Sequence, residues 1–137
     1  MGTILAIDYG LKRVGLAVSD PGRTFAFPCD VIENKNSDYL ISQINNLILK
    51  KDVDLILIGM PYNQGSEKKS MESIVRDFIN KLKKSTNIPV KTADERLSSF
   101  AANENLKEAG LSAKKSKKYI DSEAARLLLE EFIQVLK

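Results

Sequence analysis

The chain has 137 residues, enough for one domain and too few for two of ordinary size. Hydrophobic residues make up 43% and charged residues 28%, which is typical of a chain that folds around a core, and the net charge of +3 permits a nucleic-acid partner without requiring one. Because there is no histidine and only one cysteine, Cys29, the composition excludes Ser-His-Asp and Cys-His catalysis, His- or Cys-rich zinc sites and an intrachain disulfide.

Three strands are predicted in the first third of the chain, separated by turn residues. They cover residues 3–8, 14–19 and 24–33. The first two read as an antiparallel hairpin around residues 9–13, and Asp20-Pro21-Gly22 is a strong turn signal before the third. Pro28 favours an edge or bulge position for the third strand.

The rest of the chain alternates helices with strands. We expect a helix around residues 40–48, a strand over 53–58, a polar loop over 62–69, a helix over 71–82, a strand over 88–93, a helix from Ser98 or Ser99 to about Ala109, and a last helix from Ser112 or Ser116 to near the C-terminus. This order predicts a single α/β domain over residues 1–137. Its mixed five-stranded sheet joins an antiparallel meander of three strands to two parallel strands, with helices on both faces.

Two acids follow strands of this predicted sheet. Asp8 ends the first strand, and Glu95 comes just after the fifth, next to Asp94. If the first, fourth and fifth strands are parallel, these acids emerge at the carboxyl edge, where open α/β sheets bind ligands. Strand parity alone does not decide whether residue 94 or residue 95 points into the site.

A third acid, Asp121, heads an apolar stripe of the last helix. Residues Ala125, Leu128, Phe132 and Val135 follow it at helical spacing. A buried lone carboxylate costs several kcal/mol unless it is paired or bound to a cation. The alternative, that Asp121 reaches water or pairs with a lysine of 114–118, has about even weight when this acid is considered alone.

Three carboxylates held together repel one another, so such a site usually binds a cation. Oxygen ligands of this kind suit Mg²⁺ or Mn²⁺, which activate water and stabilise the charge on a scissile phosphate. In a chain without histidine, these acids are the candidate catalytic apparatus.

Two groups of cations accompany the acids. Lys12 and Arg13 lie in the glycine-containing turn after Asp8, where they either hold phosphate or are solvated residues of an ordinary hairpin. The second group lies just before Asp121 and consists of Lys114, Lys115, Lys117 and Lys118. It is either a phosphate-binding cluster or a solvated helix end.

At these motifs the chain resembles the YqgF family of pre-16S rRNA nucleases, which are similar to Holliday-junction resolvases. The opening resembles the family pattern Asp-x-Gly-x-x-Arg-x-Gly-x-Ala-x-Ser-Asp, here from Asp8 to Asp20. Gly59-Met60-Pro61, Asp94-Glu95-Arg96-Leu97-Ser98 and Asp121 with Ala124-Ala125 follow in the family's order. The match spans nearly the whole chain, and the first and third motifs together are quite specific.

The resemblance implies a ribonuclease-H-like fold in which Asp8, Glu95 and Asp121 are the catalytic and metal-binding acids, and so selects Glu95 over Asp94. It implies hydrolysis of a nucleic-acid backbone with Mg²⁺ or Mn²⁺, in maturation of the 5′ end of 16S rRNA. Arg96 joins Arg13 and the lysines as a candidate phosphate contact. Precursor rRNA or ribosomal particles are then the expected partners.

Three alternatives remain open. The first is a resolvase, which would cut branched DNA as a dimer, whereas we favour a monomer. The second is a non-catalytic binding module that uses the acids structurally. The third is a sugar-kinase-like ATPase, which normally needs two such domains, whereas this chain has room for one. No apolar run approaches the roughly 18 residues of a membrane span, and the first residues lack a secretory signal. With the lone cysteine, this predicts a cytoplasmic protein without a membrane partner.

Overall fold

The computed structural model describes residues 2–61, 65–94 and 113–136. Its elements are β1 (Thr3–Asp8), β2 (Arg13–Ser19), β3 (Ala26–Glu33), α1 (Ser37–Lys50), β4 (Val53–Met60), α2 (Gly65–Ser85), β5 (Val90–Asp94) and α4 (Ala113–Leu136). This order confirms the predicted one, while the helix expected up to about Ala109 lies outside the described residues. Within the described part of the chain, no helix has the length and apolar character needed to cross a bilayer.

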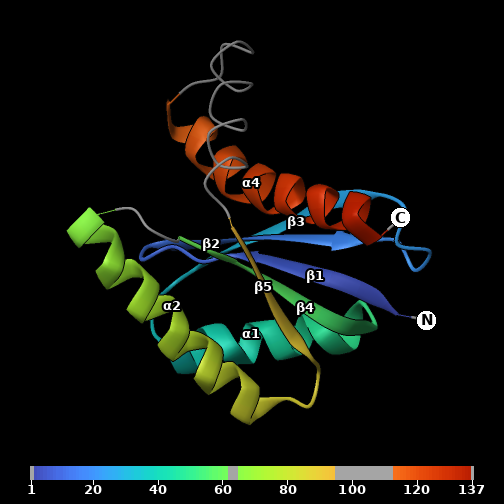
Figure 1. The fold of residues 1–137 in the computed structure, drawn as a ribbon, viewed down its shortest axis with the longest axis horizontal. Helices are drawn as coiled ribbons and strands as arrows, with labels where there is room; N and C mark the ends of the chain where they lie inside the picture. Colours follow the sequence, from blue (N-terminus) through green and yellow to red (C-terminus); the bar gives the residue numbers. More distant parts are fainter. Residues whose placement is uncertain (1, 62–64, 95–112, 137) are drawn as a thin grey trace.

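The strands form one five-stranded mixed sheet in the order β3-β2-β1-β4-β5. β2 pairs antiparallel with both β1 and β3, whereas β1 pairs parallel with β4 and β4 pairs parallel with β5. Helices α1 and α2 lie on one face and α4 on the other, as Figure 1 shows. The predicted meander, the parallel pair and the helices on both faces are therefore confirmed.

Alternation along the strands sends side chains into two separate cores. In β1, Leu5 and Ile7 pack under α1 and α2, whereas Ile4 and Ala6 pack under α4, and all four are fully buried. β4 alternates in the same way, which explains why its sequence is an almost continuous apolar run. The side on which a strand residue lies can therefore be read from its neighbours two positions away.

The edge strand β3 contains an irregularity beside Pro28. Gly15 and Ala17 of β2 pair with Val31 and Pro28, so β3 has one extra residue between these pairs. This is a β-bulge, and it confirms that the proline lies at an edge and next to a bulge.

The predicted polar loop over residues 62–69 is wrong from Gly65 onward, because α2 begins there. Ser66, Glu67, Lys68 and Lys69 show no apolar periodicity, so the pattern gave no helix signal. Glutamate and lysine are nevertheless good helix formers, and they extend the amphipathic helix by a polar turn and a half.

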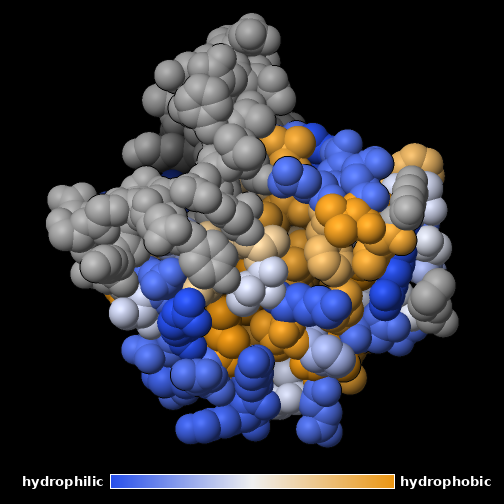
Figure 2. All heavy atoms as spheres, viewed as in Figure 1, coloured by the Kyte–Doolittle hydropathy of each residue, from blue (hydrophilic) through white to orange (hydrophobic). Residues whose placement is uncertain are grey.

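The predicted apolar stripe of α4 holds for Ala125, Leu128 and the partly buried Phe132, but Val135 is 80% exposed. Val135 lies near the end of α4, where it lines a shallow hollow with Ala93 and Phe132 instead of joining the core. Figure 2 shows apolar atoms at the surface of this face of the molecule, bordered by hydrophilic side chains. The buried row instead includes Leu129 and Ile133, on the adjacent side of the helix. 

A polar contact ties the start of β1 to β4 and to the β2–β3 turn. The carboxylate of Asp54 accepts a hydrogen bond from the Gly2 amide at 2.9 Å and another from the Arg23 guanidinium. Arg23 has a φ of 55°, a left-handed conformation that is uncommon for a residue with a Cβ. The Gly2 hydrogen bond, followed by the Arg23 charge, lowers the pKa of Asp54 from its ordinary value.

We predict that Asp54→Asn lowers the thermal unfolding midpoint at neutral pH by about 1–4 °C, because a half-exposed ion pair contributes on the order of 0.2–1 kcal/mol. A carboxyl whose folded-state pKa is lowered stabilises the protein above its unfolded pKa, and this stabilisation is lost as the pH falls through the folded value. The difference between the wild type and the variant in thermal melts should therefore shrink as the pH is lowered below 3.8, the ordinary pKa of an aspartate. The exposed Asp77 on α2 supplies the control, since Asp77→Asn removes an acid outside this contact. An unchanged difference at low pH would contradict this prediction.

Candidate active site

Asp8 is placed at the carboxyl end of the central strand β1, on the face covered by α4. It pairs with Gly15 of β2, and it follows Ile4 and Ala6 in the alternation that faces α4. Its side chain is half-buried, between the apolar core and the edge of the sheet. A carboxylate in this position remains reachable by a ligand while its backbone is fixed by the sheet.

The parallel strands β1, β4 and β5 all end at this edge, at Asp8, Met60 and Asp94. Neighbouring strands lie about 4.8 Å apart, so the backbones of β1 and β5 are about 10 Å apart across β4. The ends of β1 and β5 are therefore close enough for groups from both strands to contribute to one site. This arrangement agrees with the edge expected from the sequence.

The residues beside Asp8 in the same row of the sheet are small. Gly15 of β2 is its partner on one side, and the register that pairs Ile7 with Ile58 brings Gly59 of β4 next on the other. Gly59 in turn pairs with Ala93 of β5. Asp8 thus stands in a row from Gly15 to Ala93 whose other side chains are at most a methyl group, and both glycines of the row are buried.

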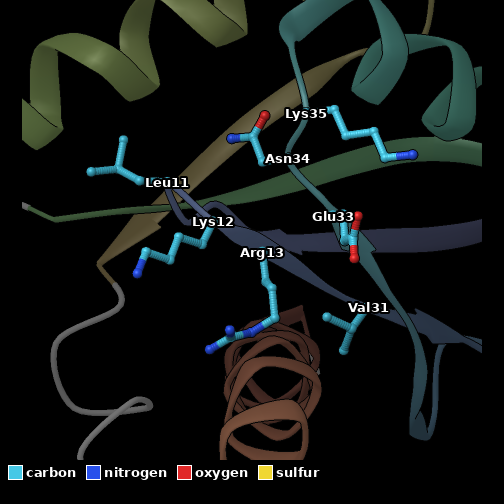
Figure 3. A pocket seen from close by; sticks show the side chains of 7 residues that line it. All are labelled: Leu11, Lys12, Arg13, Val31, Glu33, Asn34 and Lys35. Atoms are coloured by element: carbon cyan, nitrogen blue, oxygen red, sulfur yellow. The ribbon is translucent and has the colours of Figure 1, made fainter.

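Beyond Asp8, the turn at residues 9–13 presents the predicted cations Lys12 and Arg13. Lys12 is exposed and Arg13 half-buried at the start of β2. Figure 3 shows both side chains extending from this turn toward the side where β5 ends and α4 passes. The structure therefore brings Lys12 and Arg13 to the same edge as Asp8.

The turn is held in place from β3. The side-chain amide of Asn34 donates to the Gly10 carbonyl at 2.9 Å, and the Asn34 backbone N–H donates to the Lys12 carbonyl at 2.9 Å. Sequence reasoning missed this residue and the neighbouring Lys35, which line an open pocket of about 710 Å³ with the turn. Only the antiparallel register of β2 and β3 brings these residues together, and no local motif signals it.

The other predicted site residues are less completely described. Glu95 and Arg96 lie outside the described residues, so the structure does not test them. Asp121 and the four lysines of 114–118 lie on α4, whose backbone is described there while their side chains are not. Position 121 comes one helical turn before the buried Ala125, on the stripe that faces the sheet.

A metal would have to be held by oxygen ligands, since the chain has no histidine. Among the side chains that the structure describes, no group of three or more acids, cysteines or histidines is close enough to hold one. Of the three predicted metal ligands, Asp8, Glu95 and Asp121, the structure describes only the side chain of Asp8. Burial, and then the charge of Asp30, raise the pKa of the Cys29 thiol, which disfavours a thiolate nucleophile.

Some known proteins are similar to this chain in sequence, and others are similar to it in fold. A family model described as RuvX, Holliday junction resolvase, matches residues 2–135. A relative from Maridesulfovibrio salexigens is 43% identical over 130 residues, covering 95% of this chain and 96% of its own length. One from Halothermothrix orenii is 39% identical over 130 residues, covering 95% of this chain and 93% of its own length. Both are named "Putative pre-16S rRNA nuclease".

Two solved structures resemble the fold over nearly its whole length. RuvC of T. thermophilus, in complex with a Holliday junction substrate, has a TM-score of 0.63 at 13% identity and covers 99% of this chain and 96% of its own. A Fowlpox virus resolvase, in complex with Holliday junction DNA, has a TM-score of 0.56 at 16% identity with 98% of both chains covered. These likenesses confirm the expected ribonuclease-H-like fold.

The turn after Asp8 should not tolerate a side chain at Gly10. A Cβ built at this position lies 2.3 Å from the Arg13 carbonyl oxygen, a backbone atom that cannot move without opening the turn. We expect Gly10→Ala to cost about 1–3 kcal/mol in unfolding free energy, measured by denaturant titration. Gly22→Ala is the comparison, because the nearest atom there is a side-chain oxygen of Asp20 at 3.1 Å. Equal losses in both variants would show that the Gly10 contact has no special effect.

Proposed function

This chain belongs to the RuvX family, also called YqgF, and on that premise we propose that it is a metal-dependent nuclease that processes the 5′ end of precursor 16S rRNA. The observation that carries the proposal is Asp8, a half-buried carboxylate in a row of glycines and alanine at the carboxyl edge, beside Lys12 and Arg13. A half-buried acid with adjacent cations at this edge suits a phosphodiester and an ion together.

We assign the metal to Asp8, Glu95 and Asp121. The fit rests on the hard oxygen donors of this set, on the parallel pairing that brings the ends of β1 and β5 to one edge, and on the packing of α4 over β1. Mg²⁺ or Mn²⁺ bound there would supply Lewis acidity and neutralise charge during attack of water on the phosphodiester. The protein contributes the fixed position of Asp8, because β1 is paired on both sides.

Strand parity supports Glu95 over Asp94 as the partner of Asp8. In β5, Val90 packs on the α1–α2 side and Ala93 on the α4 side. Since alternate residues of a strand share a face, the pattern favours residue 95 for the face of Ala93 and Asp8. The stripe of α4 headed by residue 121 is turned toward this same face of the sheet.

Cations next to the acids would position the substrate. Lys12 and Arg13 extend toward this edge, where they would bind non-bridging phosphate oxygens (Figure 3). Arg96 and the lysines at 114, 115, 117 and 118 follow or precede a predicted metal ligand in sequence, and we propose the same role for them. We expect a monomer in the cytoplasm, with precursor rRNA or ribosomal particles as its partner.

A second candidate substrate is a four-way DNA junction. The family description and the likeness to resolvases favour it as the alternative, because the same acids would serve either backbone. Symmetric cutting of a junction requires two active sites, so this alternative also requires a dimer. A non-catalytic module is the third possibility, and it would bind nucleic acid without cleaving it.

The proposal predicts that Asp8→Asn reduces cleavage of 5′-extended precursor 16S rRNA by at least about 100-fold with Mg²⁺ or Mn²⁺, because it removes a metal ligand. Calorimetric titration with Mn²⁺ should show weaker binding in the same variant. Asp30→Asn, which changes an exposed acid of β3, should cleave like the wild type.

Cleavage of a four-way junction but not of precursor rRNA would instead favour the resolvase alternative. Equal cleavage by the wild type and Asp8→Asn would contradict the assignment of Asp8 to the active site. Binding of RNA with no cleavage of either substrate would favour the non-catalytic module.

The parity argument makes a separate prediction for the two neighbouring acids. Glu95→Gln should lower the cleavage rate by about 100-fold or more, whereas Asp94→Asn should change it by less than about 5-fold. Single-turnover rates of the two purified variants, with circular dichroism to verify folding, provide the comparison. The reverse order of the two effects would assign the site to Asp94.

A further inference from the structure

The pocket beside the candidate active site has walls from two elements that are distant in the sequence. One wall is the β1–β2 turn, with Leu11, Lys12 and Arg13, and the other is the end of β3 together with the residues that lead into α1. It is open to solvent and has a volume of about 710 Å³. Since the turn directly follows Asp8, the pocket adjoins the predicted cleavage site on the β3 side.

The cations of this pocket are spread across it. Figure 3 shows the Lys12 and Arg13 side chains extending to one side and the Lys35 side chain extending to the opposite side. Glu33, an exposed acid, lies between them on the β3 wall. Cations that bind one small anion converge on it, whereas separated cations suit an anion with repeated charges.

The two walls are fixed relative to each other before any ligand arrives. Asn34 bridges them through its two hydrogen bonds to Gly10 and Lys12, each 2.9 Å long. The Lys35 ammonium lies 5.0 Å from the centre of the Tyr39 ring, a cation–π contact with the first turn of α1. Binding here would therefore require little ordering of the protein backbone.

The pocket also offers apolar surface between its charges. Leu11 exposes 60% of its surface at the tip of the turn, and Val31 lines the opposite wall. Apolar side chains next to phosphate-binding cations suit the sugar and base of a nucleotide, which a free inorganic phosphate does not have.

We propose that this pocket binds the backbone of the nucleic-acid strand flanking the scissile bond, with Lys35 as the outermost phosphate contact. The inference rests on the proposed nuclease function and adds the path of the substrate. The strand would run from Asp8 across the β1–β2 turn to the start of α1, in the direction of β3. Lys35 is then a binding residue that does not touch the reacting bond.

The test measures equilibrium binding of a 5′-extended precursor 16S rRNA fragment by the full chain in EDTA, so that cleavage does not interfere. Lys35→Gln should raise the Kd by about 3- to 10-fold at low salt. The variant should also lose one phosphate contact, so the magnitude of the slope of log binding constant against log salt concentration should fall by about 0.7–0.9. Lys83→Gln, at the exposed end of α2, is the matched control and should leave both quantities as in the wild type.

A second variant in the same pocket should change the Kd for RNA in the opposite direction, which tests whether the Lys35 effect arises in this pocket. Glu33→Gln removes the negative charge between the cations and should lower the Kd by about 2- to 5-fold. If Lys35→Gln and Glu33→Gln both behave like Lys83→Gln, the proposed path is overturned. The path is also overturned if inorganic phosphate or a mononucleotide displaces the RNA from the wild type and from Lys35→Gln equally well.

The proposed nuclease function and the proposed substrate path are tested by different measurements, cleavage for the first and RNA binding for the second. Cleavage by the wild type, without a Lys35 effect on binding, overturns the path and leaves the nuclease. A Lys35 effect on RNA binding, without cleavage when Mg²⁺ or Mn²⁺ is restored, overturns the nuclease and supports a binding role for the pocket.

Discussion

Strand β1 lies at the centre of the sheet, antiparallel to β2 and parallel to β4, and the candidate site depends on this double pairing. Both faces of the strand are buried, so the backbone of Asp8 is fixed although the next residues form a turn. Parallel pairing through β4 brings the end of β5 to the same edge, about 10 Å away. An antiparallel β4 would have carried the fifth strand's acids to the opposite end of the molecule.

The same pairing places small residues on both sides of Asp8. Gly15 and Gly59 come from different motifs of the sequence, and only the register puts one on each side of Asp8. Both glycines are buried, so a larger side chain at either position would have to displace atoms packed over this row of the sheet. The two glycines therefore determine how closely other groups can pack against the sheet beside the carboxylate.

The sequence was sufficient to predict the sheet, its mixed topology and the edge at which Asp8 lies, because hydrophobic periodicity and turn residues are local signals. It failed where the signal is not periodic, as at the polar first turns of α2, and where a helix runs past its core, as at Val135. Asn34 and Lys35 were missed because a cross-strand register created their pocket. The preference for Glu95 comes from a family resemblance and stays a prediction, because residue 95 lies outside the described residues.

The bulge beside Pro28 has a consequence for the outer side of β3. An edge strand exposes backbone donors and acceptors to which another chain can add, and Phe27 of β3 and Phe25 just before the strand are both exposed. The proline has no N–H to donate, and the extra residue interrupts the regular spacing of the remaining groups. A second molecule would therefore meet an interrupted ladder where β3 passes Pro28, which disfavours edge-to-edge pairing beside the two exposed aromatic rings.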